Sequence, residues 1–153
     1  MQKLNQKYIN TVVKKALDED LKPRGDITTK LINFKNKKIN AKIFAKQNGV
    51  IAGLDLCKAA FKLIGKEAVF TNKVKDGTKV KKNKVIAEIR AKKKTILTAE
   101  RTALNFLNHA SGIATLTNEF IKKVNKKTKI CCTRKTTPNL RLLEKYSVKK
   151  GGG

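Results

Sequence analysis

The order of apolar patterns in the C-terminal part of the chain constrains its fold most. Apolar residues at helical spacing run over residues 96–125, with a break predicted near Ser111-Gly112. The apolar segment 129–133 (KICCT) then predicts a short strand, followed by a polar loop, RKTTP, and a further helix. This order is typical of an α/β barrel or a doubly wound sheet. In such folds functional residues follow the C-terminal ends of strands, so we look for them just after residue 133.

The N-terminal part of the sequence mixes helical and strand patterns. A helical stripe of apolar residues predicts a first helix over residues 4–17, and Asp26 is a candidate N-cap for a short helix after it. Residues 39–45 alternate between apolar side chains and Lys or Asn, except at Phe44. This alternation predicts a strand with one exposed face.

One more helix and two short strands complete this part of the chain. The patterns place them over residues 54–64, 68–71 and 85–91. Gly65 is a candidate C′ glycine for the helix, and Asp76-Gly77 predicts a turn between the two strands. The first part of the chain is therefore predicted to form a small α+β layer.

The excess of basic residues limits the classes of partner. Lys and Arg total 37 against 11 Asp and Glu, which gives a formal net charge of +26. A sequence-specific nucleic-acid binder clusters its cations on one face and favours Arg, whereas the lysines here are scattered through every segment. We therefore expect the positive field to attract polyanions without specific nucleic-acid binding.

The sequence predicts neither a membrane span nor a secretion signal. No apolar run approaches the ~20 residues that a membrane helix needs. The start, MQKLNQKYIN, contains no apolar signal-peptide core. We expect a cytoplasmic protein that does not enter the membrane.

The cysteines and the single histidine form no recognisable metal or nucleophile motif. Cys57, Cys131 and Cys132 lack the spacing of metal ligands, and free Cys is commonly buried, so we expect reduced and mostly packed thiols. His109 lies beside an apolar stripe, with no cysteine or carboxylate at the sequence spacing of a triad. We expect it to be structural, and we assign no catalytic residue and no metal ligand.

Arg134 and Lys135 are the first candidates for a binding site. Arg presents a planar fork that suits a carboxylate, and Lys presents a compact charge, so two adjacent cations after a strand suit an anionic small molecule. A solvated turn in a very basic protein is the alternative. Arg101, which follows Glu100 near the start of a helix, is taken from its position alone as a surface arginine of the first turn.

Five motifs occur along the chain in one order. They are GDITT (25–29), NGVIAG (48–53), ERTALNFL (100–107), SGIATLT (111–117) and TRKTTPNLRLLEKY (133–146). Together they closely resemble the N-terminal half of quinolinate phosphoribosyltransferase, also called nicotinate-nucleotide pyrophosphorylase (carboxylating). The resemblance covers nearly the whole chain, and its last two motifs are long and specific.

The resemblance implies a fold and a reaction. The fold is an α+β sandwich N-terminal domain with a linking helix, residues 1–110, followed over residues 111–153 by the first strand-helix unit of an incomplete α/β barrel. The family converts quinolinate and phosphoribosyl pyrophosphate into nicotinate mononucleotide, pyrophosphate and CO2 with Mg²⁺, in the de novo route to NAD.

The resemblance also implies roles for four residues. Thr133, Arg134 and Lys135 are expected to bind the carboxylates of quinolinate. Arg101 is expected to serve the same ligand in the neighbouring subunit of a homodimer.

The sequence departs from the family pattern at several positions. Cys132 stands where many relatives have Asp, Asn139 where Gly is common, and Arg90-Ala91 where a glycine is usual. Asn tolerates a left-handed conformation better than most residues, so position 139 is expected to keep its backbone shape.

The glycine run 151–153 bears on activity. In the family such a run leads into a His-Arg pair and, later, further site residues. We therefore expect the run to begin an active-site loop, and the chain to be a fragment that is inactive alone.

Two alternatives remain open from the sequence. A related molybdenum-operon pyrophosphorylase-like family shares the fold and TRKT-like features, although SGIATLT together with LEKY favours the first family. A basic module that binds nucleic acid, or a partner chain carrying the missing half, is the non-enzyme alternative. Steeply salt-dependent DNA binding would favour that module.

Overall fold

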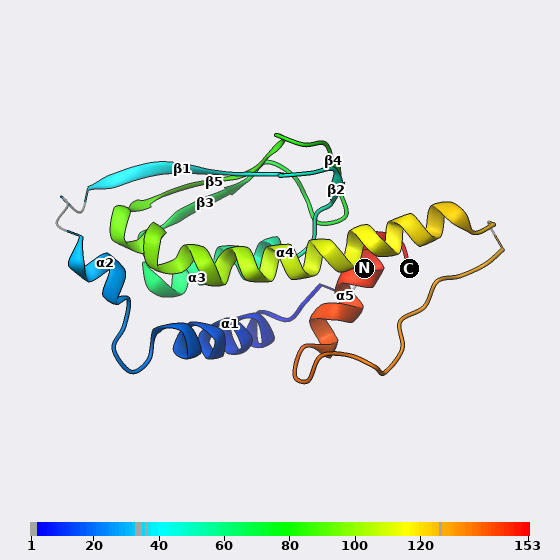
Figure 1. The fold of residues 1–153 in the computed structure, drawn as a ribbon, viewed down its shortest axis with the longest axis horizontal. Helices are drawn as coiled ribbons and strands as arrows, with labels where there is room; N and C mark the ends of the chain where they lie inside the picture. The colour runs from blue at the N-terminus through cyan, green and yellow to red at the C-terminus, as the bar shows by residue number, and fades with distance from the viewer. Residues whose placement is uncertain (1–2, 33–34, 36, 126) are drawn as a thin grey trace.

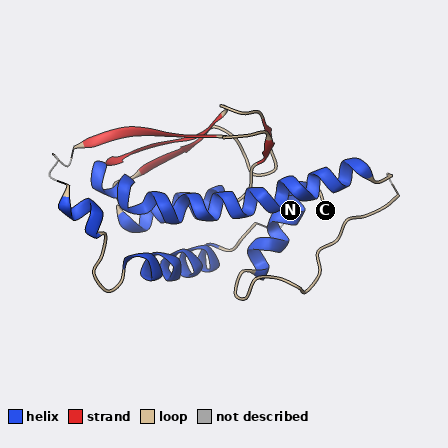
Figure 2. Ribbon diagram, in the orientation of Figure 1, coloured by secondary structure: helices blue, strands red, loops and turns tan. Residues whose placement is uncertain are grey.

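The computed structural model describes residues 3–32, 35, 37–125 and 127–153, which form a mixed α/β structure. The helices are α1 (Gln6–Leu21), α2 (Ile27–Leu31), α3 (Leu54–Ile64), α4 (Lys93–Lys123) and α5 (Arg141–Gly151). The strands are β1 (Lys38–Phe44), β2 (Gly49–Val50), β3 (Val69–Asn72), β4 (Lys79–Val80) and β5 (Val85–Lys92). Figures 1 and 2 show the strands on one side of α3 and α4 and α1 on the other side, with α5 packed near the C-terminal part of α4.

The larger sheet has the order β1-β5-β3, and all its pairs are antiparallel. β5 is central and buries Ile89 and Ala91 against the helices. The strands predicted over residues 39–45, 68–71 and 85–91 are confirmed as β1, β3 and β5. Phe44, which breaks the alternation of β1, lies where the register with β5 shifts. A bulge of this kind turns one side chain out of the regular pattern, and Phe44 is half exposed.

The first two helices form where the sequence predicts them. Helix α1 buries Ile9, Val13 and Leu17, the stripe expected from the helical spacing. Asp26 caps α2 by accepting a hydrogen bond from the Thr29 amide at 2.9 Å, and it accepts another from the Thr98 hydroxyl of α4 at 2.7 Å. Burial alone would raise the pKa of Asp26, but the hydrogen bonds from Thr29 and Thr98 hold it below the usual value. The cap therefore also ties α2 to α4.

Helix α4 is continuous, so the break predicted near Ser111-Gly112 is wrong. The helix runs unbroken through both residues from Lys93 to Lys123. A helical Gly costs only about 1 kcal/mol relative to Ala. Ala110 and Ala114, on either side of it, are fully buried, and this packing outweighs the local preference.

The hydroxyl groups of α4 bind the backbone of β2 and of the residues that follow it. Ser111 Oγ accepts a hydrogen bond from Ala52 N at 3.0 Å and donates to Ala52 O at 3.1 Å. Thr115 Oγ1 accepts from Val50 N at 2.9 Å. This close approach requires a glycine at position 49, because a Cβ there would lie 2.8 Å from Thr115 Oγ1. The NGVIAG and SGIATLT motifs thus pack against each other.

Residues 129–133 do not form a strand, contrary to the sequence prediction. A strand needs a neighbour to pair its N–H and C=O groups, and in the described part of the chain the only sheets are β1-β5-β3 and β2-β4. Cys131 and Cys132 are consequently exposed. The prediction of packed thiols is correct for Cys57 and wrong for these two, while all three cysteines are free.

Glycines end two of the helices in ways that differ from the predictions. Helix α3 stops at Ile64 as predicted, but Gly65 has extended rather than left-handed backbone, with φ −142°. Gly151 is the last residue of α5 and is buried against the Ala114 carbonyl, where a Cβ would clash. The loop expected at the glycine run therefore begins only at Gly152, whose φ is 106°.

Within the described ranges, no helix has both the length and the apolar character to cross a bilayer.

Candidate functional site

Thr133, Arg134 and Lys135 lie together on a turn between α4 and α5. All three are exposed. Thr133 Oγ1 accepts a hydrogen bond from Lys135 N at 3.0 Å, and Arg134 O accepts one from Thr136 N at 3.0 Å. Of the ion pairs found among the described residues, none involves Arg134 or Lys135. The turn therefore presents two adjacent cations with no internal counter-ion.

Arg101 is not in the first turn of its helix, contrary to the sequence interpretation. Helix α4 begins at Lys93, about two turns earlier. The Arg101 side chain is 72% exposed, and its Nη1 atom lies 3.5 Å from Asp20 Oδ1 of α1. No hydrogen bond or ion pair in the part of the chain described here links Arg101 to residues 133–135. The four predicted site residues thus do not form a single cluster within this chain.

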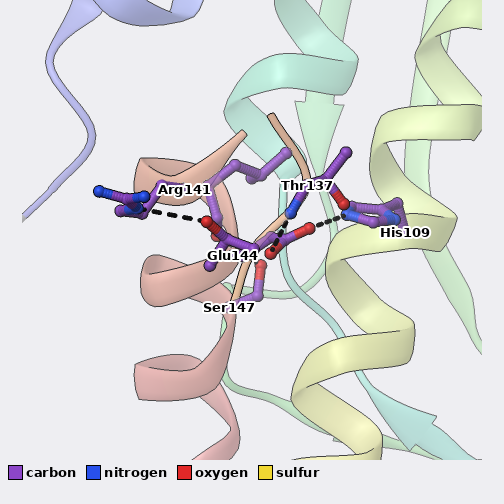
Figure 3. Close-up of polar contacts among 7 residues, drawn as sticks. His109, Thr137, Arg141, Glu144 and Ser147 are labelled. Atoms are coloured by element: carbon purple, nitrogen blue, oxygen red, sulfur yellow. Dashed lines mark hydrogen bonds and ion pairs between the residues drawn. The ribbon is translucent and has the colours of Figure 1, made fainter. Parts of the chain in front are cut away.

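A carboxylate in α5 joins the loop to α4 (Figure 3). Glu144 Oε2 accepts a hydrogen bond from the Thr137 amide at 3.2 Å, and Glu144 Oε1 lies 3.2 Å from His109 Nε2. The Glu144 side chain is 14% exposed and that of His109 40%. Burial alone would raise the pKa of Glu144, but the hydrogen bonds from Thr137 and His109 hold it below the usual value. Glu144 is therefore a well-partnered carboxylate.

Sequence reasoning missed this contact. It looked for a carboxylate at short spacing from His109, whereas Glu144 is 35 residues away in the sequence and reaches His109 only because α5 packs on α4. The one usable signal was the acidic residue in the LEKY segment directly after the candidate loop.

A partly buried contact fixes α5 to the first part of the structure. The Tyr146 hydroxyl donates to Asp76 Oδ2 at 2.7 Å, and the same carboxylate accepts from Gly53 N at 2.9 Å and from Leu54 N at 3.2 Å. Burial, and then the hydrogen bond to Asp76, raise the pKa of Tyr146. Asp76 therefore binds the backbone at the start of α3 and also holds α5. The candidate loop leads directly into α5.

A cavity of about 790 Å³ lies between the strands β1 and β2 and helix α4. Phe44, Leu107, Thr115 and Leu116 are among its lining residues. None of the four predicted site residues lines it. The cavity is therefore separate from the candidate loop.

The described residues were also tested for a metal site. In residues 3–32, 35, 37–125 and 127–153, no three or more His, Cys, Asp or Glu side chains lie close enough together to hold a metal ion. The described residues therefore identify no set of Mg²⁺ ligands.

The chain matches two parts of one known family. Residues 26–111 match the domain described as "Quinolinate phosphoribosyl transferase, N-terminal domain", and residues 113–153 match "Quinolinate phosphoribosyl transferase, C-terminal domain".

Similar proteins are found among bacteria and archaea. The chain is 42% identical over 130 residues to a probable nicotinate-nucleotide pyrophosphorylase (carboxylating) of Bacillus subtilis, covering 84% of this chain and 45% of the relative. It is also 42% identical over 149 residues to the corresponding probable enzyme of Methanocaldococcus jannaschii, covering 95% of this chain and 51% of the relative. The chain thus spans about half the length of these curated relatives.

Solved structures agree with the sequence comparison. The structure of NadC from Streptococcus pyogenes is 39% identical, with a TM-score of 0.94, and the match covers 100% of this chain and 54% of that one. The nicotinate-nucleotide pyrophosphorylase from Francisella tularensis gives a TM-score of 0.92 at 36% identity. Sequence and fold therefore agree that this chain belongs to the quinolinate phosphoribosyltransferase family.

Proposed function

We propose that the chain forms the N-terminal half of an enzyme that converts quinolinate and phosphoribosyl pyrophosphate into nicotinate mononucleotide, pyrophosphate and CO2. In this proposal Thr133, Arg134 and Lys135 bind the carboxylates of quinolinate. The observation that carries it is the turn at these residues, which presents two adjacent exposed cations that form no ion pair with any described residue. The names of the relatives support the reaction, and they do not favour the molybdenum-operon family or a basic binding module.

The chemistry of the turn suits a dicarboxylate. A guanidinium binds a carboxylate through two parallel hydrogen bonds, and an ammonium adds a charge that is not tied to one direction. The excess of positive charge over the whole chain would raise the local concentration of anionic substrates.

A homodimer would complete the site. Arg101 lies on α4, and no hydrogen bond or ion pair among the described residues links it to the turn. We therefore propose that it binds the ligand at the turn of a neighbouring subunit. The Arg101 side chain is exposed, so its ion pair with Asp20 contributes little free energy. The guanidinium therefore remains available to bind a ligand. Residues 1–110 would then be a sandwich domain, and residues 111–153 the start of a barrel that this length of chain does not close.

The resemblance implies Mg²⁺ as the cofactor. Because the described residues identify no set of ligands for the ion, we assign no step to it here. The cytoplasmic location and the inactivity of residues 1–153 alone stay predictions.

The proposal is tested by quinolinate binding to a protein of full family length that carries residues 1–153. Arg134→Ala should weaken binding by roughly 2–4 kcal/mol, the range for truncating one partner of a buried charged pair, and Lys135→Ala should act in the same direction. Lys129→Ala removes one exposed charge from the same segment and serves as the matched control. Titration calorimetry with quinolinate and, separately, with phosphoribosyl pyrophosphate gives the comparison. Equal quinolinate affinity in the Arg134→Ala and Lys129→Ala proteins would reject the assignment.

A further inference from the structure

The contacts of Glu144 point to a role in shaping the loop that carries Arg134 and Lys135. We propose that Glu144 is a positioning residue: its carboxylate holds the loop backbone at Thr137 and so orders Arg134 and Lys135 for an anionic ligand. The identity of that ligand as quinolinate rests on the proposed function, whereas the ordering of the loop does not.

The loop does not fix itself to the body of the protein. Its hydrogen bonds from Lys135 N to Thr133 Oγ1 and from Thr136 N to Arg134 O each span only two residues, and that from Leu140 N to Thr137 O spans three. They shape the turn locally but leave its placement undetermined. Pro138 adds a local restriction, because it disfavours helical backbone at the residue before it, Thr137.

Two hydrogen bonds connect the loop to α5 (Figure 3). One runs from Thr137 N to Glu144 Oε2, and the other from Arg141 Nε to Thr136 Oγ1, both at 3.2 Å. Arg141 is exposed and bonds a neutral hydroxyl, whereas Glu144 is largely buried and offers a charged acceptor. Both bonds involve a charged group, the guanidinium in one and the carboxylate in the other. They differ in exposure, because water competes for the exposed guanidinium and is largely excluded from the carboxylate. Glu144 therefore makes the stronger of the two connections.

The carboxylate is itself held from both sides. Leu143 and Ser147, next to it on α5, are fully buried, so the backbone that carries Glu144 is fixed. His109 of α4 lies 3.2 Å from the second carboxylate oxygen and restricts the side chain to one orientation. Contacts thus run from α4 through His109 and Glu144 to Thr137. They fix the position of Thr137, which follows Lys135 by two residues in the sequence.

Ordering of this kind changes ligand affinity directly. Fixing the backbone of one residue costs roughly tenfold in an equilibrium constant, and a loop that is already ordered does not incur that cost on binding. Loss of the Glu144 contact would transfer the cost to the binding step, so the affinity would fall although no ligand contact is removed.

The first experiment measures hydrogen exchange of the Thr137 amide by NMR in the 153-residue chain. Glu144→Ala should accelerate exchange about tenfold, since a hydrogen bond to a charged group is lost. Glu144→Gln keeps an acceptor for Thr137 N, so it should stay within about twofold of wild type. Glu119→Ala, which removes an exposed carboxylate from α4, is the matched control and should change nothing. His109→Ala should have a smaller effect, about threefold, because the carboxylate remains.

Fold integrity is checked in the same spectra by the amide of Leu107, inside α4. If the Glu144→Ala chain does not fold, Glu144→Asp replaces it, because aspartate keeps the charge but is one methylene too short to reach Thr137. Unchanged Thr137 exchange in a folded Ala or Asp variant overturns the inference.

The second experiment adds quinolinate to the same samples and follows the amides of Arg134 and Lys135. Glu144→Ala should raise the Kd about tenfold, and Glu144→Gln less than about threefold, a rescue that a loss of stability alone would not produce. Arg134→Ala is run in parallel. If it leaves the Kd unchanged, the proposed ligand is wrong and the exchange experiment alone decides the positioning role. If it weakens binding while Glu144→Ala does not, the positioning role is wrong and the ligand stands.

Discussion

Two glycines of this chain differ in whether the fold requires a glycine at their position. Gly53 precedes the first residue of α3 and has φ 95°, and a Cβ there would lie 3.0 Å from Ala110 Cβ and 3.3 Å from Phe106 O. Gly112 lies inside α4, and a Cβ there would meet nothing within 4 Å. The first glycine is required by backbone shape and close packing together, whereas the second is not required by the fold.

Alanine substitutions at these positions should therefore change stability in opposite directions. Gly53→Ala should lower the free energy of unfolding by roughly 2–4 kcal/mol, from a left-handed alanine and an overpacked contact. Gly112→Ala should raise it by about 0.5–1 kcal/mol, since alanine is the better helix former. Urea unfolding of both variants beside the wild-type chain measures the difference. A destabilised Gly112→Ala protein would contradict the open space seen beside the helix.

At the scale of whole elements, the packing of α5 involves a carboxylate, Glu144, whose pKa is lowered. Glu144 keeps its charge in the folded state because Thr137 and His109 bind it, although burial opposes the charge. A carboxyl group with a lower pKa in the folded than in the unfolded state stabilises the fold above its unfolded pKa. That contribution is lost as the pH falls through the folded pKa.

The stability of α5 should consequently depend on pH through Glu144. The wild-type chain should exceed Glu144→Gln in free energy of unfolding at about pH 6, and the difference should shrink steadily towards about pH 3. Urea unfolding of the pair at a series of pH values isolates this group from the other carboxylates, which are common to both proteins. A difference that stays constant over this range would mean that the charge of Glu144 contributes nothing to α5.

Local sequence patterns predicted the helices and strands whose own side chains form an apolar face. The stripe of α1 buries one face of that helix, and the alternation over residues 39–45 predicted β1, in which Ala41 and Ile43 are partly buried. Residues 129–133 have the same apolar character, but a strand needs a second strand, and the described chain offers none there. The continuity of α4 and the contact between His109 and Glu144 also depend on packing between distant segments, which no local pattern contains.

The candidate site was predicted in part. The sequence identified the cationic turn because adjacent Arg134 and Lys135 are conspicuous, and the structure places them exposed on one turn. It placed Arg101 in the first turn of its helix, whereas α4 begins at Lys93, about two turns earlier. The roles of all four residues stay predictions.

For the whole molecule, the separation of Arg101 from the turn leads to a test of assembly. If Arg101 acts in a neighbouring subunit, mixing an Arg101→Ala protein with an Arg134→Ala protein of full family length should restore activity. In a mixed dimer one site receives both defects and the other neither, so random pairing should restore as much as about a quarter of wild-type activity. Pyrophosphate release after subunit exchange measures this. If the mixture shows no activity although a labelled subunit verifies exchange, Arg101 does not act in the neighbouring site.

The bonds from Ser111 and Thr115 to Ala52 and Val50 also bear on how the chain avoids self-association. An unpaired strand edge is a template to which another polypeptide can add. Here two hydroxyls of a helix occupy the positions that an additional strand would fill. Each hydroxyl can both accept and donate, so it satisfies an amide and a carbonyl as a backbone would. Helix α4 therefore covers the β2 edge of the smaller sheet through the hydroxyl groups of Ser111 and Thr115.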